Sequence, residues 1–381
     1  MSKRPLTIFP ARRMLGVINL LMTVPENHVL FIGSPVCARH DMTMGLYEYW
    51  RNISFLTLNE LELIRGDFDQ IIDKAITRIL NKARPKPQAI TLYTGCPMQF
   101  MAADFDSLLQ NLEEKHGIYF GHFRMNRMKT SGRQIFPQLF KSLFSYLRLK
   151  EKKPTINLLG STARLEPENE LEKCLAQASI EQVLTLKAME DFRSFTEMGA
   201  SRANIILHAN YLLAARDMEK RLGIPWIYLP VVYDPEQIEK QYAEIGNLLG
   251  CDLDIAGSKQ NALDSIEKTK ALVGDTPLVF DVIGIHKPFS MLVALVKMGF
   301  KVTGFKHAPY DAYCDQSQTE ALEWLKLSSK VDTEHNERLE FSYERLRPAQ
   351  MKNNSFEGAY FGFAAVEHLM HCIREAYHKN E

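Results

Sequence analysis

The chain has 381 residues, 46% of them hydrophobic and 24% charged, which suits two or three globular domains. Its 46 basic and 46 acidic residues give a formal net charge of zero. This balance gives no reason to expect a nucleic acid or an anionic membrane as partner. We also expect no membrane span and no signal peptide, because no apolar run reaches about 18 residues and Pro5 and Pro10 break the first stretch.

Short apolar runs alternate with longer amphipathic stretches from the start of the chain. In the first third, the predicted strands are His28–Ile32 and Ala89–Tyr93, and the predicted helices are Asp67–Lys82 and Ala103–Lys115. This alternation predicts parallel strands joined by right-handed crossovers. The basic stretch Arg148–Pro154 ends the block.

The same pattern restarts twice further along. The second block has predicted strands at Thr155–Leu159, Ile180–Leu186, Asn204–His208 and Trp226–Leu229, and predicted helices at Glu168–Ala178, Met189–Met198, Ala209–Leu222 and Pro235–Leu249. The third has helices at Asn261–Leu272, Pro288–Met298 and Gly362–Tyr377, and strands at Pro277–Ile283 and Lys301–Gly304. We therefore predict an α/β chain of three doubly wound, parallel-sheet (Rossmann-like) domains, with boundaries 1–152, 153–258 and 259–381.

Two cysteines lie where such a fold binds ligands. Ligands of doubly wound sheets bind outside the carboxyl ends of strands. Cys37 follows the first predicted strand, and Cys96 follows the strand that ends at Tyr93. Both precede a predicted helix, where free N–H groups favour a thiolate. Two thiolates are half the ligand set of a four-cysteine iron–sulfur cluster, and a dimer could supply the other half. The alternative is that both are small buried hydrophobic residues.

Other chemistry-bearing residues are less specific. Six cysteines without a secretory signal fit reduced thiols or metal ligands in a cytoplasmic protein. We interpret Cys174, Cys251 and Cys372 as structural. His208, His307 and Asp311 follow strands and are candidate pocket or proton-transfer residues, with hydrogen-bonded packing as the alternative. The chain has no G-x-x-x-x-G-K-[ST], G-x-G-x-x-G, C-x-x-C, H-E-x-x-H or G-x-S-x-G motif, which argues against common ATPases, dehydrogenases and hydrolases.

The cysteine loops resemble a known family, nitrogenase component 1. Gly33-Ser-Pro-Val-Cys37 is similar to its first cysteine loop, and Tyr93-Thr-Gly-Cys96-Pro followed by Ala103-Asp104 is similar to its second. The segments ending in Gly223-Ile-Pro-Trp226 and Phe361-Gly-Phe363 resemble later parts of the same family, in the same order.

This resemblance implies the fold predicted above, of the nitrogenase component 1 type. It also implies that Cys37 and Cys96 are ligands of a [4Fe–4S] cluster that bridges two subunits of a homodimer or of a pair of paralogous component 1-like chains. Electrons would come from an ATP-dependent iron–sulfur reductase. The substrate would be a small molecule, with a tetrapyrrole as one candidate, and His286 joins His208, His307 and Asp311 as a pocket candidate.

Three departures from the family narrow the expected function. Ala11 and Arg12 stand where the family has an upstream cysteine, so a cluster needs a two-plus-two arrangement or further ligands, with Asp41 as one oxygen candidate. Ala209 stands where the active-site metallocluster is anchored, and no histidine is near Lys352. We therefore expect a nitrogenase-like reductase that does not reduce dinitrogen. The alternatives are a scaffold for metallocofactor assembly and a cluster-free partner subunit.

Overall fold

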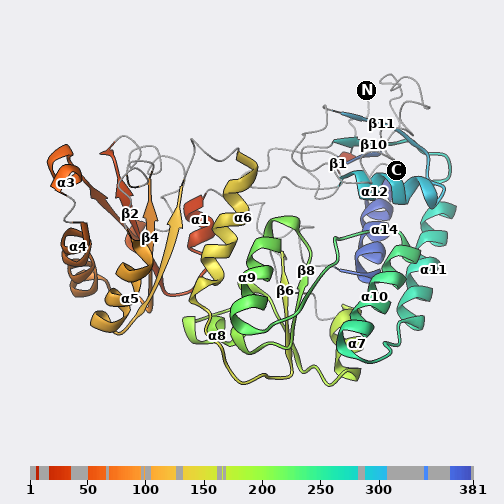
Figure 1. Cartoon of the computed structure of the whole chain (residues 1–381). Helices are drawn as coiled ribbons and strands as arrows, with labels where there is room; N and C mark the ends of the chain where they lie inside the picture. The colour runs from red at the N-terminus through yellow and green to blue at the C-terminus, as the bar shows by residue number, and fades with distance from the viewer. Residues whose placement is uncertain are drawn as a thin grey trace. The chain divides into compact units, whose positions relative to one another are not determined.

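A computed structural model gives the fold of the chain (Figure 1). It describes residues 6–7, 17–35, 50–65, 68–95, 98, 104–125, 132–160, 165, 169–281, 288–306, 339–341 and 361–378. Within these ranges the strands form three four-stranded sheets. Their orders are β3-β2-β4-β5, β7-β6-β8-β9 and β1-β12-β10-β11.

The strands are short, and the pairs with a described register are parallel. Their bounds are β1 Leu6–Thr7, β2 Asn27–Gly33, β3 Ile53–Thr57, β4 Ala89–Thr94, β5 Tyr119–Arg124, β6 Thr155–Leu159, β7 Gln182–Leu184, β8 Ala203–Ile206, β9 Trp226–Tyr228, β10 Leu278–Asp281, β11 Val302–Lys306 and β12 Leu339–Phe341. Parallel strands need crossover connections, and in the described ranges α5 supplies the one between β4 and β5 and α9 the one between β8 and β9.

The α-helices are α1 Val17–Leu21, α3 Glu60–Arg65, α4 Phe68–Lys82, α5 Phe105–His116, α6 Gly132–Leu143, α7 Glu170–Gln177, α8 Phe192–Glu197, α9 Leu212–Leu222, α10 Pro235–Leu249, α11 Ala256–Val273, α12 Pro288–Lys297 and α14 Phe363–His378. Short 3-10 turns are η1 Trp50–Asn52, η3 Phe144–Tyr146, η4 Leu186–Ala188, η5 Met198–Ala200 and η6 Ala209–Tyr211. No helix in the described ranges is long and apolar enough to cross a membrane.

The chain divides into two compact units that interleave in sequence. One, here called the N unit, contains residues 14–160 and 184–228, and the other, the C unit, contains residues 1–13, 161–183 and 229–381. The division falls inside β7. The domain boundaries at residues 152 and 258 expected from the sequence stay a prediction.

The first sheet of the N unit has an apolar core on each face. Successive side chains of its central strands belong alternately to one core and to the other. In β2, Val29 and Phe31 belong to one apolar core, and Leu30 and Ile32 belong to another. The neighbouring strand β4 repeats the pattern, since successive side chains of a strand point to opposite faces. The helices α4 and α5 contribute their apolar stripes to the second core (Figure 1). Near-continuous apolar runs are typical of a parallel strand covered on both sides.

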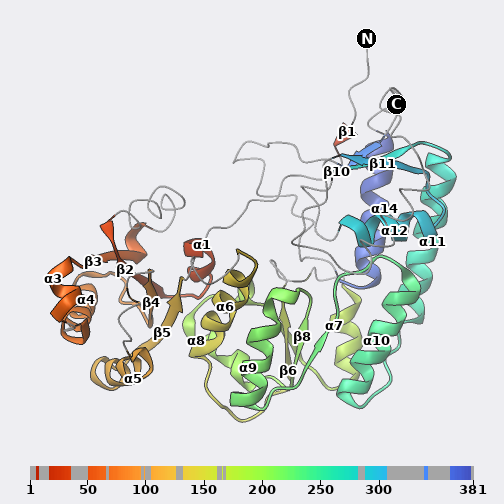
Figure 2. The ribbon, with the colours of Figure 1, turned by 45° about the horizontal axis from the view of Figure 1, so that its top comes forward.

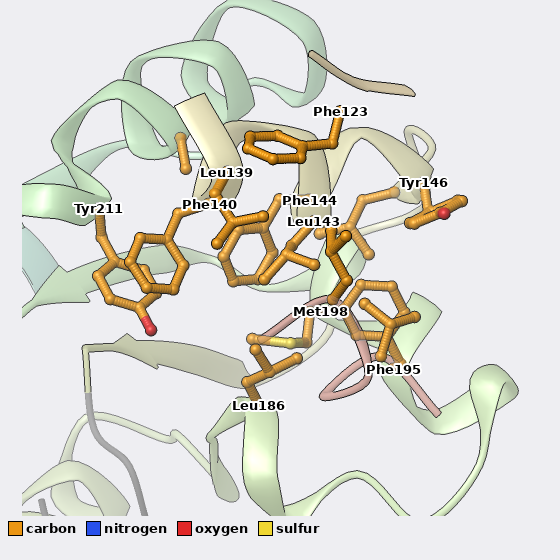
Figure 3. Close-up of a cluster of buried hydrophobic side chains, with 14 of the residues drawn as sticks. Phe123, Leu139, Phe140, Leu143, Phe144, Tyr146, Leu186, Phe195, Met198 and Tyr211 are labelled. Carbon is orange, nitrogen blue, oxygen red and sulfur yellow. The ribbon is translucent and has the colours of Figure 1, made fainter. Parts of the chain in front are cut away.

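Helix α6 fills the larger core of the N unit. Its Leu139 and Leu143 are fully buried, and its Phe140 stacks on Tyr211 with ring centroids 3.9 Å apart. Figure 3 shows these side chains beside Phe123, which comes from β5, and Phe195, which comes from α8. The helix therefore joins elements of the first two sheets in one apolar cluster.

The C unit is built on a bundle of long helices. Figure 2 shows α10, α11 and α14 beside one another, and these helices contact each other pairwise. Glu170, the first residue of α7, is 5% exposed and accepts hydrogen bonds from the Tyr242 hydroxyl (2.9 Å) and from the backbone N–H groups of Phe363 (2.5 Å) and Ala364 (3.1 Å). This carboxylate satisfies the free N–H groups at the start of α14.

The α/β class and the parallel sheets confirm the fold predicted from the sequence. The predicted strand Thr155–Leu159 and helix Pro235–Leu249 have the observed bounds of β6 and α10. The sequence interpretation missed β3, β5 and α6.

Candidate functional site at the strand ends

The strand order of the first sheet reverses between β2 and β4. The chain runs from β2 to β3 on one side and then returns to β4 on the other side. Ligands of doubly wound sheets bind at this reversal of strand order, outside the carboxyl ends. The Gly95 N–H, just past β4, donates to the Ile32 carbonyl of β2 at 2.9 Å. The two strand ends at this reversal are therefore hydrogen-bonded neighbours.

Gly33 leaves room for the ring of Phe31, which lies two residues earlier in the same strand. A Cβ atom built on Gly33 would lie 2.8 Å from Phe31 Cζ and 3.8 Å from the Gly95 Cα. The first distance is too short for a real side chain, so the position needs glycine or a shift of the Phe31 ring. Cys37 follows Gly33 by four residues, and Cys96 follows Gly95 directly. Both cysteines lie outside the described residues, but their loops begin at neighbouring strand ends.

Residues after Cys96 in the sequence make defined hydrogen bonds near the ends of β4 and α5. Met98 is 3% exposed, and its N–H donates to the Gly95 carbonyl at 3.3 Å. Asp104 is the N-cap of α5 and accepts from the Ser107 N–H (3.2 Å) and the Ser107 hydroxyl (2.6 Å). These hydrogen bonds lower the pKa of Asp104, so the cap is charged at neutral pH.

His122 contacts both ends of this segment. Its Nε2 lies 2.8 Å from the Thr94 hydroxyl, and its ring stacks on Phe105 with centroids 4.1 Å apart. Burial, and secondarily the charge of Arg124, lowers the pKa of His122 to about 3, so the ring is neutral at pH 7. The sequence interpretation missed His122 because it missed β5; the available signal was the enrichment of aromatic residues at 119–123.

The second sheet repeats the topology of the first, with the reversal between β6 and β8. Gly160 follows β6 with φ +101°, and a Cβ atom there would meet the His208 backbone nitrogen at 2.8 Å. Only glycine fits such a position. His208 follows β8, so it lies at the place where this sheet would receive a ligand.

The ring of His208 has a defined tautomer in its neutral form. Its Nδ1 accepts a hydrogen bond from the Asn210 N–H at 3.1 Å, so the proton of the neutral imidazole is on Nε2. The side chain is half-buried. The Nδ1 atom of His208 is therefore bonded to the backbone two residues further along the chain.

The remaining candidates fall outside the described part of the chain. These are Asp41, His286, His307 and Asp311. In the described ranges, no group of three or more His, Cys, Asp or Glu side chains is arranged to hold a metal ion.

Cys174 is a buried thiol whose surroundings disfavour the thiolate that a metal ligand or a nucleophile needs. It is 2% exposed and its thiol donates to the Asp254 carbonyl at 3.3 Å. Burial, reinforced by the charges of Glu170 and Asp254, raises its pKa to about 11. The thiolate form is therefore scarce at neutral pH.

Known proteins resemble the chain in sequence and in fold. The sequence model of the family described as "Nitrogenase component 1 type Oxidoreductase" matches residues 13–351. The nitrogenase molybdenum-iron protein alpha chain of Methanosarcina barkeri is 21% identical over 320 residues, which cover 77% of this chain and 58% of that protein. The chain thus spans less than two thirds of the length of this relative.

Solved structures of nitrogenase Cp1 share the fold. The structure at pH 6.5 has a TM-score of 0.63 at 12% identity and covers 100% of this chain and 94% of its own. The structure at pH 5 has a TM-score of 0.55 at 13% identity and covers 100% of this chain and 91% of its own. With a family match over most of its residues, the chain belongs to the nitrogenase component 1 type oxidoreductases.

Proposed function

We propose that the chain is the substrate-reducing component of a nitrogenase-like reductase. The observation that carries the proposal is that the loops of Cys37 and Cys96 leave adjacent strand ends at the reversal of the first sheet. Family membership supports a reductase, and the absence of a phosphate-binding G-x-x-x-x-G-K-[ST] motif supports a separate ATP-dependent iron–sulfur protein as the electron donor.

Cys37 and Cys96 would hold one half of a [4Fe–4S] cluster. The donor set fits such a cluster, since thiolates are its usual ligands and neighbouring strand ends direct both loops to one edge of the sheet. No third cysteine stands at Ala11 or Arg12, so a second copy or a paralogous chain supplies the other two thiolates. When bound, the cluster transfers single electrons toward the substrate. A cytoplasmic location belongs to the same proposal.

The substrate would be a small unsaturated molecule, with a tetrapyrrole as one candidate. His208 would lie beside this molecule as a pocket or proton-transfer residue, because it follows β8 at the reversal of the second sheet. His307 and Asp311 are proposed proton donors. Ala209 leaves no thiol for anchoring a metallocluster beside His208, which suits an organic substrate.

Iron and sulfide analysis with electron paramagnetic resonance tests the cluster on protein purified without oxygen. We expect about four irons per pair of chains and a reducible signal. Cys37→Ala and Cys96→Ala should each abolish both. Cys251→Ala is the control, because Cys251 is a free, half-buried thiol of the C unit that is not a proposed ligand. Full iron content in Cys96→Ala would refute the ligand assignment.

Protein that is folded but takes up no iron after anaerobic reconstitution would reject the enzyme as proposed. The two other functions would then be tested directly. A scaffold would bind a metallocluster precursor and release it to a second protein. A cluster-free subunit would bind a paralogous chain that carries the cluster ligands itself.

A further inference from the structure

We infer that His122 is a positioning residue that holds both flanks of the segment that carries Cys96. Its ring contacts Thr94, two residues before Cys96, and Phe105, nine residues after it. One side chain thus connects the point where the segment leaves β4 to the point where it enters α5. This inference rests on the proposed role of Cys96 as a ligand.

The two contact partners are themselves immobilised. Thr94 is 1% exposed, and its carbonyl accepts a hydrogen bond from the Met125 N–H at 3.0 Å. Phe105 is 4% exposed and belongs to the apolar core under α4 and α5. A hydrogen bond and a ring stack to fixed groups restrict the imidazole in both position and orientation.

The backbone of His122 is held from the opposite side. Ser142 of α6 donates its hydroxyl hydrogen to the His122 carbonyl at 2.8 Å. In the sheet, His122 is opposite Leu92, so its side chain lies on the face that Leu92 shares with Thr94. The ring therefore reaches along the sheet face toward the carboxyl end of β4, where Cys96 follows.

The same sheet contains a matched pair at its other end. His28, the second residue of β2, lies with its Nε2 2.9 Å from the hydroxyl of Ser54, the second residue of β3. Like the half-buried His122, the buried His28 is bonded to a hydroxyl on a neighbouring strand. This pair is at the amino ends of its strands, away from both cysteine loops, so it serves as the control.

The test measures the alkylation rate of Cys96 by iodoacetamide in metal-free protein, with mass spectrometry to resolve each cysteine. Thr94→Val removes the hydroxyl and keeps the shape, and His122→Phe keeps an aromatic ring on Phe105 but cannot bond to Thr94. We expect both variants to raise the Cys96 rate by about threefold or more, as expected for the loss of one buried hydrogen bond. The Cys251 rate should not change.

Thr94→Ser restores the hydroxyl and should return the Cys96 rate to the wild-type value. Ser54→Ala, in the control pair, should leave it unchanged. A wild-type rate in Thr94→Val, no rescue by Thr94→Ser, or an equal rise in Ser54→Ala would each overturn the role of His122. In the reconstituted protein, Thr94→Val should also shift the resonance signal of the cluster.

The two proposals fail in different ways. Wild-type protein that binds no iron refutes the cluster, whatever the alkylation rates are. Wild-type protein with a normal cluster, whose Thr94→Val variant has unchanged alkylation and an unchanged signal, refutes only the positioning role.

Discussion

Gly362 lies where the start of α14 meets the buried carboxylate of Glu170. Its φ is +69°, and a Cβ atom there would clash with Glu170 Oε1 and lie 2.6 Å from the Tyr242 hydroxyl. The position therefore has two independent requirements for glycine. One is the left-handed backbone, and the other is the space that lets Glu170 reach the N–H groups of α14.

Gly362→Ala should destabilise the protein by more than about 2 kcal/mol, because backbone strain and the clash add together. Gly250→Ala is the matched control, since Gly250 has φ +73° but nothing within 4 Å of a built Cβ. The control should lose about 1 kcal/mol from strain alone. Urea unfolding followed by circular dichroism measures both, and equal losses would contradict the close contact.

His28 makes the stability of the fold depend on pH in a known direction. It is 4% exposed, and burial lowers its pKa from 6.5 to about 4. Between these values the unfolded chain binds more protons than the native one, so stability rises with pH. The contribution is complete above pH 6.5 and is lost as the pH falls toward 4.

His28→Gln should therefore be less sensitive to acid than the wild type. A pKa shift of this size corresponds to about 3 kcal/mol, which is the largest difference expected between the two proteins across that pH range. Unfolding free energies at several pH values measure it. Parallel curves for His28→Gln and wild type would contradict the burial of a neutral imidazole.

The sequence patterns identified some residues of the candidate site and missed others. Cys37, Cys96 and His208 could be proposed because each follows an apolar run that ends a strand. His122 could not, because its importance depends on a ring stack and a hydrogen bond to residues 17 and 28 positions away. Such pairings are set by strand order, which local patterns do not encode.

At the scale of elements, α6 is a helix that forms although it contains a proline. Pro137 lies inside this helix, where it removes an N–H that would bond to the Arg133 carbonyl. A proline at this position disfavours a helix at residues 132–143. The burial of Leu139, Phe140 and Leu143 in the N unit outweighs this cost, since each large apolar side chain contributes about 1.5–3 kcal/mol when buried.

Leu143→Ala should cost about 2–5 kcal/mol, because Leu143 is 0% exposed and sits in the core drawn in Figure 3. The same substitution at Leu149, which is 70% exposed, should stay within about 0.5 kcal/mol. Thermal unfolding of the two variants tests the comparison. A small effect at Leu143 would mean that α6 does not anchor this core.

At the scale of the whole molecule, the ends of the chain contribute to one sheet. Leu6 and Thr7 form β1, which pairs in parallel with Leu339 and Glu340 of β12. The sequence predicted the parallel α/β class because helix and strand periods recur locally. It did not predict β1 or β12, since strands of two and three residues carry no period and their pairing spans most of the chain.

Deletion of residues 1–7 should therefore weaken the third sheet without affecting the first. Removing β1 exposes the edge of β12, whose N–H and C=O groups then bond to water. Hydrogen exchange followed by mass spectrometry should show faster exchange in peptides covering β12 and β10, which is paired with β12. Peptides covering β2 and β4 serve as the internal reference and should keep the wild-type rate. Deletion of residues 379–381 is the matched control at the other terminus. If β12 exchanges equally fast in the wild type and in the 1–7 deletion, then β1 does not stabilise this sheet.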